Sequence, residues 1–133
     1  MSDMAPTTRR GRWTLTDRVR SPWHYLPLEV PPGTTGLRAE IGYDRSAGVL
    51  DLGCLGPAGF RGWSGGARRS FTITAAEATP GYLPGELEPG TWQVIIGLHR
   101  LPADGLEYEL TTEMSRSPGA LAPGPPARPP PPR

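Results

Sequence analysis

The residues that most suggest catalysis form the run Gly62-Trp63-Ser64-Gly65-Gly66, which matches the pattern G-x-S-x-G. In one hydrolase fold this pattern places a nucleophilic serine on a sharp strand-to-helix turn, beside backbone amides that stabilise an oxyanion. His99 follows downstream, with Glu77, Glu86 and Glu88 between, so the order serine, acid, histidine is present. The strand-like segment SFTITA follows the serine, however, and no helix does. We therefore interpret the match as a chance feature of a glycine-rich hairpin or crossover loop.

Residues that could bind a metal are few. His24 and His99 are the only histidines and Cys54 is the only cysteine, whereas a catalytic zinc takes three protein ligands. Cys54 lies in the apolar run VLDLGCLG, which predicts a buried, inert thiol and excludes an intrachain disulfide. His24 falls on the apolar side of its segment and His99 on a solvent side. We predict no catalytic, cofactor-binding or metal-binding residue in this chain.

Length and charge narrow the classes of partner. The chain has 133 residues and a net charge of +1, which predicts one domain without a strong electrostatic partner. Its ends are basic and residues 21–114 are acidic, a distribution that argues against nucleic-acid binding. All the basic residues are arginine, as expected for a GC-rich bacterial genome, and the phosphate-loop lysine is missing. No segment resembles a signal peptide or a membrane span, so we expect a cytoplasmic protein with no membrane partner.

The elements that must position these residues have a period of two. Alternating apolar residues are typical of half-buried strands, and proline- and glycine-rich turns separate them. No window shows a helical stripe, and only TAAEA could form one helical turn. The pattern predicts an all-β fold, an antiparallel, jelly-roll-like β-sandwich of about seven to eight strands. The strand segments are 12–19, 24–30, 36–43, 49–55, 70–75, 91–99 and 106–111.

Composition divides the chain into three parts. Residues 1–11 are expected to form a flexible N-terminal arm and residues 12–114 the β-sandwich domain. Residues 115–133 contain the run PGALAPGPPARPPPPR, which predicts an extended, proline-rich linker or tail.

The tryptophans raise the question of a sugar-binding face, because carbohydrate-binding sandwiches often display Trp and Tyr on a sheet or loop. Alternation assigns Trp13, Trp23 and Trp92 to the core, which leaves Trp63 and Tyr82 as loop residues. We favour a role for Trp63 in capping the open end of the sandwich, since a small domain needs its large apolar side chains.

Several motifs together resemble one known family. The segments HYLPLEVPPGTTGLRAEIGYD, VLDLGCLGPAG, GWSGGAR, ATPGYLPG and PGTWQV occur in this order. They resemble the N-terminal domain of CehA/McbA-type metallohydrolases, members of the PHP (polymerase and histidinol phosphatase) superfamily, over about residues 12–113. In that family a β-sandwich precedes a catalytic domain that binds divalent metals through an H-x-H pair and further ligands. This chain contains no H-x-H, so no catalytic residue carries over.

The resemblance implies a non-catalytic accessory module that packs against, orients or oligomerises a PHP catalytic domain, in cis or in trans. A stand-alone protein-binding or carbohydrate-binding module is the alternative. A second copy of the chain, in a homo-oligomer, is a further candidate partner. A ligand role for the P-x-x-P spacing of the tail is a variant of the second account. The expected contact surface is a loop with permissive glycines and arginine donors. It comprises Phe60, Arg61, Gly62, Trp63, Ser64, Gly65, Gly66, Arg68 and Arg69, with Tyr82 from a neighbouring turn.

Overall fold

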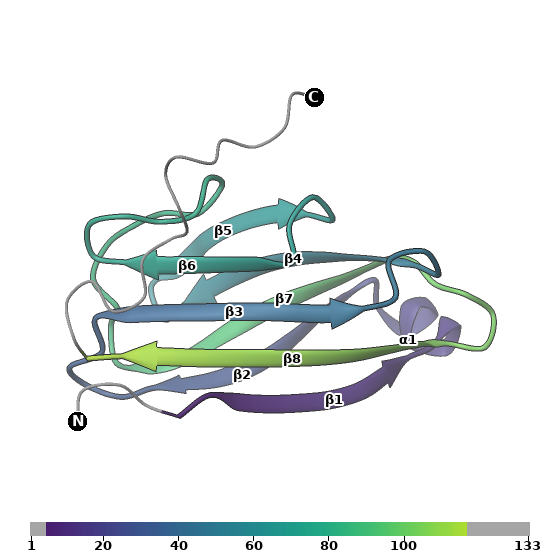
Figure 1. The fold of residues 1–133 in the computed structure, drawn as a ribbon, viewed down its shortest axis with the longest axis horizontal. Coiled ribbons are helices and arrows are strands. Elements are labelled where there is room, and N and C mark those ends of the chain that lie inside the picture. Colours follow the sequence, from purple (N-terminus) through teal and green to yellow (C-terminus); the bar gives the residue numbers. More distant parts are fainter. Residues whose placement is uncertain (1–4, 117–133) are drawn as a thin grey trace.

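The computed structural model describes residues 5–116, which fold into two layers of β-strands with one short helix at an end (Figure 1). The predicted proline-rich tail lies outside these residues, apart from Ser115 and Arg116. In the described part of the chain, no helix has the length and apolar character needed to cross a membrane. The elements are β1 (Thr7–Trp13), α1 (Leu15–Arg20), β2 (Trp23–Val30), β3 (Gly36–Tyr43), β4 (Val49–Gly56), β5 (Gly59–Gly65), β6 (Ser70–Thr74), β7 (Gly90–Arg100) and β8 (Leu106–Ser115).

The strands form two antiparallel sheets of four. Sheet A has the order β1-β8-β3-β6 and sheet B the order β2-β7-β4-β5. Strand β1 pairs with β8, β2 with β7, β3 with β6 and β4 with β5. Pairing of the first strand with the last, and so on toward the middle of the chain, is the topology of an eight-stranded jelly roll. The predicted all-β sandwich is confirmed.

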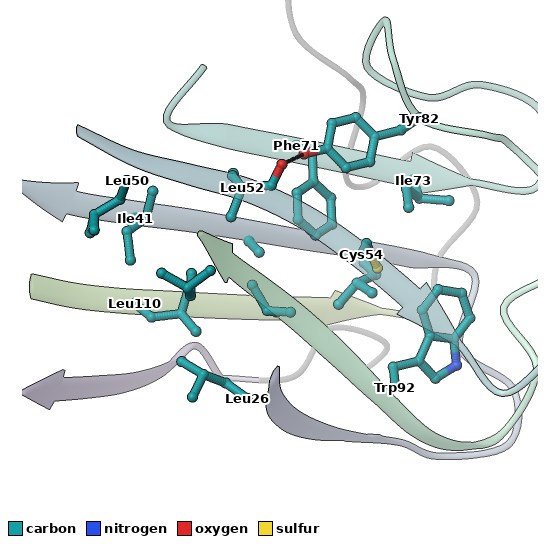
Figure 2. Packing of buried hydrophobic residues seen from close by; sticks show 14 of the residues in the cluster. Leu26, Ile41, Leu50, Leu52, Cys54, Phe71, Ile73, Tyr82, Trp92 and Leu110 are labelled. Carbon is teal, nitrogen blue, oxygen red and sulfur yellow. Dashed lines mark hydrogen bonds between the residues drawn. The ribbon is translucent and has the colours of Figure 1, made fainter. Parts of the chain in front are cut away.

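The core lies between the two sheets and is built from inward positions of every strand except β5 (Figure 2). Trp92 and Phe71 are fully buried, and Tyr82 stacks on Phe71 with the ring centroids 4.5 Å apart. Arg61 closes one end of this core, because its guanidinium lies 4.8 Å from the centre of the Trp92 ring. The alternation predicted for residues 24–30, 36–43 and 91–99 is confirmed at Leu26, Ile41 and Trp92, which are buried.

The N-terminal region differs from the prediction in two ways. The arm expected over residues 1–11 contains most of β1, which pairs with β8 from Thr7 onward. The strand expected to run through Val19 ends at Trp13, and α1 follows it. Thr14 and Asp17 form a capping box, in which each side chain accepts a hydrogen bond from the other residue's backbone N–H. The helix leaves Val19 87% exposed instead of buried, and TAAEA forms no helical turn.

The glycine-rich run expected to be a loop is strand β5. It forms a hairpin with β4, with register shifts after Leu52 and after Cys54. Its other edge is covered by a later segment, because Trp63 N–H donates to Gly81 O and Leu83 N–H to Arg61 O. Glycine suits this strand because Gly62 has a φ of +152° and an added Cβ there would lie 2.2 Å from the Tyr82 ring.

Candidate binding face

Ser64, the residue of the G-x-S-x-G match, has a structural role. Its hydroxyl lies 2.8 Å from the Tyr82 hydroxyl and 3.3 Å from the Leu52 carbonyl oxygen, on the core side of sheet B. His99 is exposed and lies at an outward position of β7, so the two side chains point to opposite sides of the sheet. Ser64 is followed by a turn and β6 and not by a helix. Among residues 5–116, the Ser64 hydroxyl therefore has no histidine or carboxylate partner that could act as a base.

Tyr82, expected in a loop, belongs to the core. It is 5% exposed, and its hydroxyl donates to the Leu52 carbonyl oxygen at 3.1 Å (Figure 2). Burial is the main reason why its pKa is raised well above the ordinary tyrosine value. The ring lies over Gly62, which explains why that position has no side chain.

The histidines serve separate parts of the fold. His24 packs against the Trp13 ring at 4.7 Å, and its Nε2–H donates to the Ser21 carbonyl oxygen at 2.8 Å. This agrees with the predicted hydrogen-bonded histidine at the rim of the core. Across residues 5–116, no three His, Cys, Asp or Glu side chains gather closely enough to hold a metal ion.

Of the three arginines expected to offer donors at the contact loop, Arg61 is already engaged within the fold. Arg61 donates to the carbonyl oxygens of Leu83, Gly85 and Glu86 at 3.1–3.3 Å. Its guanidinium also lies 3.6 Å from a Glu88 carboxylate oxygen. Arg61 thus ties the segment after Tyr82 to β5. Gly65 ends β5 opposite Leu52 of β4, and Gly66 follows that strand. Of the residues predicted for contact, Phe60, Trp63, Arg68 and Arg69 keep some exposed side chain or surface.

The outward side of sheet B carries an unusual set of side chains. Trp23, Tyr25 and Phe60 are 43%, 48% and 55% exposed, and Trp63, which contacts Trp23, is partly exposed. We call this surface, defined by Trp23, Tyr25, Phe60 and Trp63, the aromatic face. A sheet side turned to solvent ordinarily carries polar residues, so exposed rings concentrated there indicate a contact surface.

Sheet A provides the comparison within the same fold. Its outward side is lined by ion pairs between β1 and β8, with Arg10 2.6 Å from Glu109 and Arg12 2.9 Å from Glu107. A shallow depression of about 590 Å³ over Gly11 and Gly42 lies among these pairs. The large apolar side chains exposed in residues 5–116 are Leu15, Val19, Trp23, Tyr25, Phe60 and Leu83, and none belongs to sheet A. The aromatic character therefore belongs to one side of the molecule.

Two glycines make room for the indoles on the aromatic face. A Cβ at Gly97 would lie 2.5 Å from Trp23 Cζ3, and a Cβ at Gly53 would lie 2.6 Å from Trp63 Cε3. The glycines occupy the two central strands, β7 and β4. The indoles therefore extend from the edge strands across the outward side of the sheet and lie over these glycines. They meet edge to face with centroids 5.2 Å apart at 73°. Such a contact holds both rings in place.

Asp51 is the carboxylate of this surface. Its Oδ2 lies 3.0 Å from the point where a Gly97 Cβ would be, next to the Trp23 ring. No other residue of the described chain forms a hydrogen bond or an ion pair with this carboxylate. Burial raises the pKa of Asp51 above its ordinary value, and the charge of nearby His99 offsets only part of that effect.

Sequence reasoning placed Trp23 in the core and Trp63 at the open end of the sandwich, and both assignments are wrong. The signal for Trp23 was present, because Leu26 and Val30 point inward and the period of two turns residues 23 and 25 outward. Trp63 gave no such signal, since its strand is rich in glycine. Trp13 and Trp92 are buried as predicted.

Compared with models of known protein families and with curated proteins, the sequence matches none of them. The resemblance to the CehA/McbA-type N-terminal domain therefore stays a prediction.

Proposed function

We propose that this chain is a non-catalytic β-sandwich module that binds its partner through the aromatic face. One observation carries the proposal. Exposed aromatic rings are concentrated on the outward side of sheet B, whereas the outward side of sheet A has charged residues in pairs. Leaving three such rings in water is unfavourable, and burial against a partner reverses that cost.

The chemistry of the other candidate groups supports recognition over catalysis. The Ser64 hydroxyl serves the Tyr82 and Leu52 contact, and Cys54 is a buried thiol whose pKa burial raises to about 12. A thiol with so high a pKa is a poor nucleophile at neutral pH. His24 is bonded to a backbone carbonyl. Among the described residues, neither the Ser64 hydroxyl nor the Cys54 thiol is hydrogen-bonded to a histidine or a carboxylate.

The family resemblance adds a setting for this module. It implies association with a PHP-type, metal-dependent hydrolase domain, to which the module would supply recognition or orientation. We also propose a cytoplasmic location, on the sequence grounds given above. Both statements depend on the resemblance and composition, and the binding role depends on the aromatic face alone.

The catalytic question has a direct test. The full chain is incubated with p-nitrophenyl phosphate, bis-p-nitrophenyl phosphate and p-nitrophenyl acetate, with and without Mn²⁺. We expect no turnover above the buffer rate and no difference between the wild type and Ser64→Ala. Turnover that disappears in Ser64→Ala or His99→Ala would overturn the proposal.

The NMR signals of the four tryptophans can show which surface of the protein binds a partner. Their indole N–H groups give separate signals in a two-dimensional ¹⁵N–¹H spectrum, and Trp13 and Trp92 are buried controls. A separately produced PHP catalytic domain and a set of oligosaccharides are titrated in turn. Any partner that binds should shift the Trp23 and Trp63 signals more than the other two. Binding that leaves Trp23 and Trp63 unchanged contradicts this assignment of the face.

A further inference from the structure

Trp23 and Tyr25 form one part of the aromatic face. The Trp23 ring lies over Gly97 on one side and is 43% exposed, so part of it is available to a ligand. Tyr25 is the next outward residue of the same edge strand and is 48% exposed. Two residues along a strand are roughly 6.6 Å apart, so the two side chains leave the backbone at adjacent outward positions of β2.

A hydrogen-bond acceptor stands beside the first ring. Asp51 Oδ2 and Trp23 Cζ3 lie 3.0 Å and 2.5 Å from the same point above Gly97, so carboxylate and ring are neighbours. The carboxylate is partly desolvated and has no hydrogen-bond donor among the described residues, and hydrogen bonds to an ionised acceptor are among the stronger ones. A ligand with an apolar face and a hydroxyl at its rim would satisfy both groups together.

The arrangement excludes two other ligand classes. A quaternary ammonium is recognised by rings that surround it, but Trp23 and Trp63 contact each other at 5.2 Å and leave no space between them. A phosphate needs cationic donors, but the chain has no lysine, and β2 and β4 contain no arginine. The arginine of β7, Arg100, lies at the end of that strand opposite Val49. Asp51 would moreover repel an anion.

We propose that the Trp23, Tyr25 and Asp51 arrangement on sheet B is a carbohydrate site that takes the pyranose rings of a neutral glycan. The C–H bonds on one face of a pyranose carry partial positive charge, which complements the negative π face of the indole. A rim hydroxyl donates to the Asp51 carboxylate, and a second sugar ring contacts Tyr25. This inference rests on the proposed binding function of the aromatic face and names its ligand.

The test is a titration of the full chain with neutral hexasaccharides of glucose (β-1,4, β-1,3 and α-1,4 linked), xylose, mannose and N-acetylglucosamine. Binding is measured by calorimetry and by the indole N–H signals. At least one glycan is expected to bind and to shift the Trp23 signal. Trp23→Ala should weaken that glycan about tenfold or more, and Asp51→Asn about fivefold.

Matched variants separate the site from general effects of mutation. Leu83→Ala removes a comparably exposed apolar side chain, 52% exposed, outside the site and should change affinity less than about twofold. Gly97→Ala keeps the ring and the carboxylate but displaces the indole, so it should weaken binding about as much as Trp23→Ala. Equal urea midpoints for Trp23→Ala, Asp51→Asn and the wild type verify that folding is intact.

Each outcome decides between the proposals. If no glycan binds but the PHP domain shifts Trp23 and Trp63, the carbohydrate site is wrong and the binding function stands. A glycan that binds with equal affinity to wild type and Trp23→Ala overturns the site. Binding of tetramethylammonium in place of glycans overturns the ligand class. If neither glycans nor the PHP domain bind, both proposals fail.

Discussion

Removal of the hydroxyls around Leu52 tests whether Ser64 is a structural residue. The hydroxyls of Ser64 and Tyr82 both lie within reach of the Leu52 carbonyl oxygen, at 3.3 and 3.1 Å, and lie 2.8 Å from each other. Leu52 has no exposed surface, and the β4–β5 register shifts at this position. The oxygen therefore depends on these donors.

The size of the effect follows from which bonds survive. Ser64→Ala and Tyr82→Phe should each lower the free energy of unfolding by about 1 kcal/mol, since the other hydroxyl still reaches the carbonyl. Both single variants lose the hydrogen bond between the two hydroxyls, so adding their losses of unfolding free energy counts this bond twice. The sum therefore overestimates the loss in the double variant by about 1 kcal/mol. The double variant also leaves the carbonyl without either hydroxyl, at a further cost of about 1–3 kcal/mol. The lost bond between the hydroxyls, counted once, and the unpaired carbonyl together should lower the free energy of unfolding of the double variant by about 2–4 kcal/mol.

Equilibrium urea unfolding, followed by tryptophan fluorescence, measures all four proteins, with equal m-values as the check on two-state behaviour. Ser46→Ala is the matched control, because its hydroxyl only bonds the exposed Asp44 carboxylate, and it should change stability by less than about 0.5 kcal/mol. A double variant no less stable than either single variant would refute the reasoning, because it would mean that the carbonyl does not need these hydroxyls.

Three further predictions concern single positions. Gly62→Ala should cost about 3 kcal/mol or more in urea unfolding, because the new Cβ would lie 2.2 Å from the Tyr82 ring at a φ of +152°. Gly59→Ala, at a φ of +135° with no atom within 4 Å, should cost only about 1–2 kcal/mol, and equal losses would contradict the clash. The backbone N–H of Thr14 lowers the Asp17 pKa below 3.8, so the carboxylate stabilises the fold above that pH and loses this effect on acidification. Melting curves of the wild type and Asp17→Asn should therefore differ at neutral pH and converge in strong acid; a constant difference argues against the cap. Burial raises the Cys54 pKa to about 12, so the native thiol should react with Ellman's reagent only after urea unfolding, and prompt reaction of the native protein would contradict its burial.

Short elements with atypical composition escaped the sequence analysis. Helix α1 has six residues, too few to show a helical stripe, and its one local signal is the spacing of Thr14 and Asp17. Strand β5 contains three glycines in seven residues and so resembles a loop, because glycine has a low strand propensity. It is held as a strand by β4 on one side and by the segment at residues 81–83 on the other.

The amino-acid sequence alone determined the class of fold and most of the core, because inward and outward positions along a strand alternate and need no knowledge of neighbouring strands. It also determined that the described chain has few groups able to do chemistry. Only the tertiary structure decided that Trp23 and Trp63, forty residues apart, meet over Gly97 and Gly53, with Asp51 beside them. That arrangement depends on the order and register of four strands from distant parts of the chain, which no local pattern encodes.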